Sequence, residues 1–117
     1  MRARKSPNYD AVCFHAQQCA EKYLKAVLQE SGTRIPKIHF LLELLGMIIK
    51  IDGSYEFLKA DLETLEEYAV RFRYPGHFAE KEEAQVAYAA TGAVRKFCRQ
   101  KMIWSDGSIY QQRSLAD

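Results

Sequence analysis

Apolar residues recur every three or four positions along most of this chain, and this spacing is typical of helices with one buried face. The segment from Asn8 to Glu30 is rich in Ala, Gln, Glu, Lys and Leu, which favour the helical conformation. Ser6 or Asn8 can cap the start of this helix, and Gly32 can end it. The residues expected to face the core from this first helix are Val12, Ala16, Cys19, Tyr23 and Val27.

Three more helices follow, separated by turn residues that include Pro36, Gly53 and the pair Pro75-Gly76. We expect them to span about residues 39–51, 55–70 and 80–103. Their expected core positions are Phe40, Leu41, Leu44, Leu45 and Ile48, then Phe57, Leu58, Leu62, Leu65 and Ala69, then Ala84, Val86, Ala87, Ala90, Val94 and Phe97. The alternating pattern of β-strands is absent from the sequence. The chain is therefore predicted to be all-α, an antiparallel up-and-down helical bundle of four main helices.

The length and composition of the chain fit one folded domain. It has 117 residues, of which 48% are hydrophobic and 27% are charged, and this mixture excludes an intrinsically disordered protein. We expect one helical domain over residues 1–103 and a polar tail over residues 104–117. The formal net charge of +2 argues against a general nucleic-acid binder, so any such role needs a local patch.

The cysteines and the apolar segments bear on the cellular compartment. Cys13, Cys19 and Cys98 form no CxxC pair and have no metal-ligand spacing. The most apolar stretch, residues 40–49, is far shorter than the ~20 residues that span a bilayer. We therefore expect a cytoplasmic protein with reduced thiols, no metal, no cofactor and no membrane contact.

The segment between the third and fourth helices concentrates chemically useful side chains. Arg71 and Arg73 could bind phosphate through their guanidinium groups, and Tyr74 could stack on a base. The start of the next helix would add N–H donors for an anion, and His77 could transfer protons near neutral pH. The residue types alone favour a simpler interpretation, in which this segment is a helix-breaking loop whose arginines pair with the acidic third helix.

A polar face lies in the middle of the first helix. Gln18, Glu21 and Lys25 belong to it, and Glu21 and Lys25 are spaced as an ion pair across one helical turn. Such a pair contributes only about a few tenths of a kcal/mol when exposed, so a solvated surface is the favoured interpretation. His39 opens the second helix, and a single histidine at a helix boundary is more often structural than a metal ligand.

Three segments together resemble the HEPN domain (higher eukaryotes and prokaryotes nucleotide-binding domain). The stretch YDAVCFHAQQCAEKYLKAVL, residues 9–28, looks like the second-helix signature of that family. His39 before the sequence LLELL resembles the start of another family helix, and Arg73-Tyr74-Pro75 matches the RYP motif of one branch. In this order and spacing, the resemblance covers residues 9 to about 100.

The resemblance implies an all-α bundle that is commonly a homodimer and is often encoded beside a minimal nucleotidyltransferase. Such pairs look like toxin–antitoxin modules, with the HEPN protein as the toxin or as the partner of the nucleotidyltransferase. The resemblance makes Arg73 and Tyr74 the candidates for binding a nucleotide or phosphate. The polar residues with an interface or structural role would be Gln18, Glu21, Lys25 and His39.

The same resemblance leaves three functions open. The chain could be the nucleotide-binding or partner component of the module, or a non-catalytic dimerisation scaffold. It could also be a metal-independent RNase toxin acting on RNA, since some HEPN branches use an Arg-x(4–6)-His motif across their dimer interface. Arg71 and His77 satisfy that spacing with five residues between them, and they would then be the catalytic pair.

The sequence departs from the family pattern at two places. Phe40 stands where an acidic residue is expected after His39, which removes a favourable charge and leaves that helix start poorly capped. Only eight residues precede Tyr9, where family members usually carry a whole helix, so we expect the first family helix to be truncated. A partner chain or a longer gene product could then cover the apolar stripe of the helix that begins near Tyr9.

Overall fold

The protein is a bundle of four α-helices with a short 3-10 helix between the second and third. The computed structural model describes residues 8–72, 74 and 76–106. Its elements are α1 (Tyr9–Glu30), α2 (Leu41–Ile49), η1 (Gly53–Leu58), α3 (Lys59–Arg71) and α4 (Lys81–Asp106). Within those residues there is no strand, so the predicted all-α helical bundle is confirmed.

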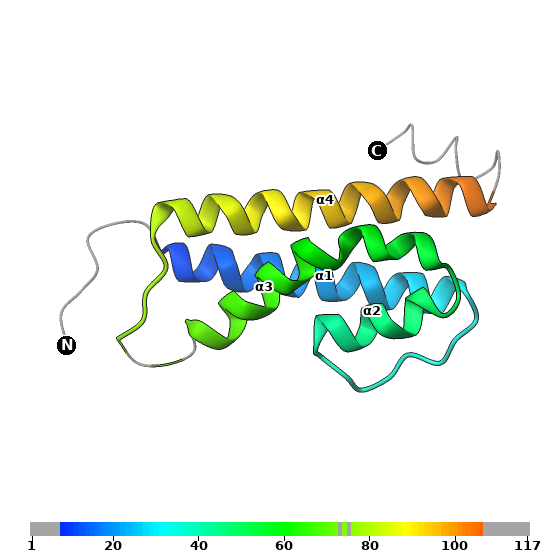
Figure 1. Cartoon of the computed structure of the whole chain (residues 1–117), viewed down its shortest axis with the longest axis horizontal. Coiled ribbons are helices and arrows are strands. Elements are labelled where there is room, and N and C mark those ends of the chain that lie inside the picture. The colour runs from blue at the N-terminus through cyan, green and yellow to red at the C-terminus, as the bar shows by residue number, and fades with distance from the viewer. Residues whose placement is uncertain (1–7, 73, 75, 107–117) are drawn as a thin grey trace.

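The two long helices α1 and α4 lie side by side and run in the same direction (Figure 1). The loop over residues 31–40 carries the chain back along α1 before α2 begins, and α3 then runs antiparallel to α4 (Figure 1). Two polar contacts join segments near the two ends of the bundle. The N–H of Ala79 donates to Oδ1 of Asp10 at 2.5 Å, and Nζ of Lys101 lies 3.0 Å from Oδ2 of Asp52.

The core is formed by one face of each helix. The largest fully buried side chains are Leu24, Leu28, Leu41, Leu44, Ile48, Leu58, Leu62, Leu65, Val94 and Cys98. These include most of the leucines predicted for α2 and α3. Leucines at helical spacing lie on one face of a helix, and burying that face removes a large apolar surface from water. The predicted stripe and the observed core therefore agree best in α2 and α3.

The predicted core stripe of α1 is confirmed at Ala16 and Val27, which are buried, but not at its other three positions. Val12 is 37% exposed, and Cys19 and Tyr23 are only half-buried. The fully buried positions are Ala20, Leu24 and Leu28. The physical reason is that α2, α3 and α4 all pack on α1, so its buried surface is centred between them, away from the side that Val12 faces.

Three other predicted core residues are exposed. Phe40 is 57% exposed because it precedes the first turn of α2. Phe57 is 73% exposed because it lies in η1, where its ring stacks at 5.5 Å on Phe97 at the surface. Val86 is 46% exposed on α4, between the buried positions Ala84 and Ala87.

Side chains determine where two of the helices begin. At α1, Oδ1 of Asn8 accepts a hydrogen bond from the N–H of Ala11, as its N-cap position predicts. At α2, Phe40 provides no side-chain cap, and Oε1 of Glu66 on α3 instead accepts from the N–H of Leu42 at 3.2 Å. The start of α2 therefore depends on a side chain from another helix.

Helix α4 ends at Asp106, slightly beyond the expected end near residue 103. The remainder of the expected tail, residues 107–117, lies outside the described residues. Among the residues that the structure does describe, no helix is both long and apolar enough to cross a membrane.

Candidate functional site

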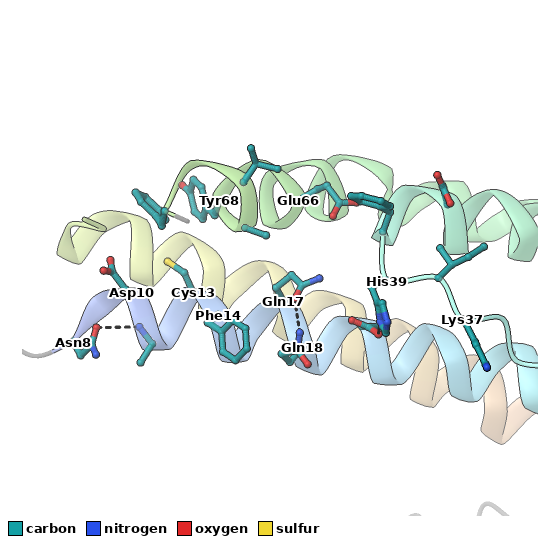
Figure 2. Close-up of a pocket in the computed structure, with 18 residues that line it drawn as sticks. Asn8, Asp10, Cys13, Phe14, Gln17, Gln18, Lys37, His39, Glu66 and Tyr68 are labelled. Carbon is teal, nitrogen blue, oxygen red and sulfur yellow. Dashed lines mark hydrogen bonds and ion pairs between the residues drawn. The ribbon is translucent and has the colours of Figure 1, made fainter. Parts of the chain in front are cut away.

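A groove of about 860 Å³ runs along α1, between it, the end of α3 and the loop that leads into α2. Figure 2 shows Asp10, Cys13 and Gln17 of α1 facing Glu66 and Tyr68 of α3 across this groove. Tyr68 and Cys13 are almost fully buried on its floor. We call it the α1–α3 groove.

A buried carboxylate is the centre of the polar cluster in this groove. Glu21 is only 7% exposed, and its Oε2 lies 3.0 Å from Nζ of Lys25 and 2.7 Å from Nδ1 of His39. Three of the four polar residues singled out in the sequence are thus brought together. The solvated face expected there is wrong at Glu21, because α2 and its preceding loop fold over that part of α1.

The ionisation of Glu21 reflects two opposing effects. Burial alone would raise the pKa of its carboxyl group, but hydrogen bonds from His39 and Lys25 together outweigh burial and hold the pKa below 4.5. Because an ionised carboxylate only accepts hydrogen bonds, Nδ1 of His39 must carry the proton of their bond. The second oxygen of Glu21, Oε1, is buried and has no hydrogen-bond partner among the described residues.

The fourth polar residue, Gln18, lies beside a buried amide. Its Nε2 donates to Oε1 of Gln17 at 2.9 Å, and Gln17 is 7% exposed. Both residues line the α1–α3 groove one turn before Glu21 (Figure 2). The groove therefore combines buried polar atoms of α1 with the aromatic and aliphatic side chains of α3.

At the end of the groove nearest the start of α1, Cys13 lies close to acidic side chains. Burial raises the pKa of the Cys13 thiol, and the negative charges of Asp10 and Glu83 raise it further. A thiol is nucleophilic only as the thiolate, so Cys13 is unsuited to catalysis. Its role is to pack in the core, as its 4% exposure indicates.

The hinge between α3 and α4 holds Arg71 in a network with acidic side chains. Its Nη2 donates to Oε2 of Glu83 at 3.0 Å, and its Nη1 lies 3.7 Å from Oε2 of Glu67. The guanidinium carbon lies 5.1 Å from the centre of the Tyr68 ring and 4.9 Å from that of Phe72. The pairing expected with the acidic third helix is therefore present for Arg71, together with a pair to α4.

The other hinge residues lie at the surface. Tyr74 is 60% exposed, and its ring centre lies 6.5 Å from that of His77, which is also exposed. The N–H of His77 donates to the carbonyl of Tyr74 at 3.3 Å. Arg73, the candidate phosphate ligand of this segment, lies outside the described residues.

Two N–H groups just before the start of α4 are bound by carboxylates of the chain itself. The N–H of Glu80 donates to Oε1 of Glu83 at 2.7 Å, and the N–H of Ala79 donates to Asp10. These carboxylates occupy donors that a phosphate would need, and their negative charge repels one. The N–H groups of the first turn of α4 itself, which begins at Lys81, are further donors, so anion binding there stays a prediction.

Comparison with known families agrees with the all-α fold and with the resemblance to the HEPN domain. The model of the HEPN domain matches residues 2–101, most of the chain. The chain belongs to the HEPN domain family. It has no significant match among curated proteins and none among solved structures.

This HEPN domain contains polar contacts that its sequence did not indicate. Glu66 of α3 accepts from the first turn of α2, and Asp10 of α1 accepts from the N–H of Ala79 just before α4. Glu83 pairs with Arg71 and also caps α4. A signal existed only for Glu83, three residues after Glu80, which is the spacing of a helix capping box. Across the described residues, His, Cys, Asp and Glu form no group of three or more that could hold a metal ion.

Proposed function

We propose that this HEPN protein belongs to the RYP branch and is the nucleotide-binding or partner component of a module with a minimal nucleotidyltransferase, of the toxin–antitoxin type. The observation that carries this proposal is the exposed pair of rings at the hinge, Tyr74 and His77. An exposed aromatic face can stack on a base, a contact worth about 1–3 kcal/mol. Arg73, adjacent in sequence, would supply the phosphate contact.

The ion pairs around the hinge restrict which side chains could bind a phosphate. Arg71 is already paired with Glu67 and Glu83, and the start of α4 is capped by carboxylates. Of the two hinge arginines, Arg73 is therefore the candidate for the phosphate contact. We expect modest affinity for a free nucleotide, and tighter binding where the partner enzyme presents the nucleotide to the hinge.

Nucleotide binding and partnership are tested separately. We expect the neighbouring nucleotidyltransferase to co-purify with this chain on co-expression, and a nucleoside triphosphate to raise the melting temperature of the chain or complex. Arg73→Ala should abolish the melting shift, whereas Arg34→Ala, in an exposed loop before α2, should preserve it. Absence of both the complex and the shift would refute the proposal.

We also propose that the protein is a homodimer that packs through α1 and α4. A hollow of about 370 Å³ lies between these helices, and its lining includes Val12, Tyr88 and Gly92. Tyr88 is 73% exposed and Val12 37%, and the lack of a side chain at Gly92 allows a close approach. Light scattering after size-exclusion chromatography should give a dimer mass that Tyr88→Glu converts to the monomer mass.

The alternative is a metal-independent RNase toxin with Arg71 and His77 as the catalytic pair. Their placement on one hinge favours it, while the two ion pairs of Arg71 favour a structural role for that residue. The purified chain would cleave RNA in the presence of a chelator, and His77→Ala would remove the activity while Lys50→Ala, exposed after α2, would not. If the protein neither cleaves RNA nor binds a nucleotide, the remaining function is that of a dimerisation scaffold.

A further inference from the structure

The α1–α3 groove has an excess of negative charge. Its lining includes the carboxylates of Asp10, Glu21, Glu43 and Glu66, against the ammonium of Lys37 and the imidazole of His39. The imidazole is already bound to Glu21. A phosphate or nucleotide would be repelled by this surface, whereas a cationic ligand would be attracted to it.

One of these carboxylates is buried and incompletely paired. The side chain of Glu21 is 9% exposed, and Lys25 and His39 both contact its Oε2. Its Oε1 has no hydrogen-bond partner among the described residues, although burying a charged acceptor without a partner costs at least about 1–3 kcal/mol. This unpaired oxygen is an observation independent of the acidic lining, and it leaves Glu21 with an acceptor that a donor of a bound partner could satisfy.

The groove is long enough for several residues of an extended peptide. From Asn8 to Glu21 it follows 13 residues of α1, which correspond to about 20 Å at 1.5 Å per residue. An extended chain advances about 3.3 Å per residue, so about six residues would fill that length. Along this path Phe14 is 58% and Phe40 57% exposed, and they provide apolar walls for side-chain stems.

We propose that the α1–α3 groove binds an extended basic segment of a partner protein, with an arginine side chain of that segment paired to Glu21. Arginine fits better than lysine, because its planar guanidinium can donate two parallel N–H bonds to one carboxylate and can stack on a phenyl ring. The His39 side chain is 75% exposed, so it can turn aside and open access to the carboxylate at small cost in packing. Glu66, across the groove, would pair with a second cation of the same segment.

This site is separate from the hinge, so the inference does not rest on nucleotide binding by Arg73 and Tyr74. Arg71, Tyr74 and His77 are not among the residues that line the groove, although Phe72, next to Arg71, is. The two proposals can therefore fail independently.

The test measures fluorescence anisotropy of a labelled hexapeptide that contains two arginines among alanines, titrated with the full chain. We expect saturable binding that weakens with added salt, and a loss of about tenfold or more when citrulline replaces both arginines, since citrulline keeps the shape and removes the charge. Glu21→Gln should weaken binding of the arginine peptide by about tenfold or more, because a charge-assisted hydrogen bond is lost. Glu63→Gln, an exposed glutamate of α3 outside the groove, is the matched control and should leave binding unchanged.

Two further variants keep the result interpretable. Glu66→Gln tests the groove without touching the buried cluster, and it should weaken binding even if Glu21→Gln unfolds the chain, which circular dichroism would reveal. A variant lacking residues 2–6 removes Arg2, Arg4 and Lys5 of the chain itself. If only this shortened chain binds the peptide, the basic residues of the same chain occupy the groove and a partner segment is the wrong occupant. Equal binding of the arginine and citrulline peptides, or no binding by any chain, would also overturn the proposal.

Discussion

Nδ1 of His39 lies 2.7 Å from Oε2 of Glu21, and this contact ties the exposed end of the loop before α2 to a carboxylate buried on α1. The two residues are 18 positions apart, and Lys25 completes the cluster from the next turn of α1. The contact holds the start of α2 against α1. No side chain of α2 itself caps this helix start. Glu21 is therefore both a structural anchor and the acidic floor of the α1–α3 groove.

We predict that the stabilising effect of Glu21 depends on pH. Its folded pKa is below 4.5, so its contribution to the free energy of unfolding is complete above 4.5 and is lost as the pH falls through the folded value. Glu21→Gln should lower the free energy of unfolding by about 2 kcal/mol at neutral pH, since two hydrogen bonds lose their charge. Urea unfolding of both proteins over a series of pH values should show the difference shrinking in acid, and a constant difference would contradict the assignment.

Two adjacent leucines of α2 should differ strongly in their contribution to stability. Leu41 is 0% exposed and Leu42 is 37% exposed. Leu41→Ala should cost about 3 kcal/mol, because it removes buried methyl groups and leaves a cavity. Leu42→Ala should cost less than about 1 kcal/mol. Chemical denaturation of the two variants measures this, and similar losses would show that α2 is rotated from the orientation described.

The start of α2 should be open to improvement by a side-chain cap. Phe40 occupies the N-cap position without a capping bond and is 57% exposed, so replacing it sacrifices little buried surface. Phe40→Ser should raise the free energy of unfolding by about 1 kcal/mol, because the hydroxyl can accept a bond from the first turn of the helix. Phe40→Ala is the control and should not stabilise. A gain with alanine equal to that with serine would rule out capping as the cause.

Arg71 should stabilise the hinge whether or not the protein cleaves RNA. Its side chain is 40% exposed, pairs with Glu67 and Glu83 and lies against two aromatic rings. Arg71→Ala should lower the free energy of unfolding by about 1–2 kcal/mol, the sum of a partly screened ion pair and a cation–π contact. Lys96→Ala, exposed on α4, should change it by less than about 0.5 kcal/mol. Thermal unfolding at low and high salt would separate the contribution of the ion pairs, which salt screens, from that of the ring contacts.

The sequence alone was sufficient for the class of fold and for its four α-helices, although the 3-10 helix η1 stands where the third helix was expected to begin. Leu41, Leu44, Leu62 and Leu65 recur at helical spacing, and nearly all of the surface of such side chains must be removed from water. Turn residues such as Gly53 and Gly76 mark where these helices separate, and Gly76 has a positive φ of 84° that other residues rarely adopt. The motifs along α1 and the hinge were likewise sufficient for the HEPN family.

Only the tertiary structure decided which side of α1 is buried and which polar residues belong to the site. The periodicity of α1 is compatible with a core on the side of Val12 or on the side of Leu24, and the choice depends on where three other helices pack. The environment of Glu21 depends on His39, and the pairing of Arg71 with Glu83 depends on the angle between α3 and α4. Helical spacing reports contacts within three or four residues along the chain. Contacts between residues far apart in sequence arise only when the packed helices bring them together.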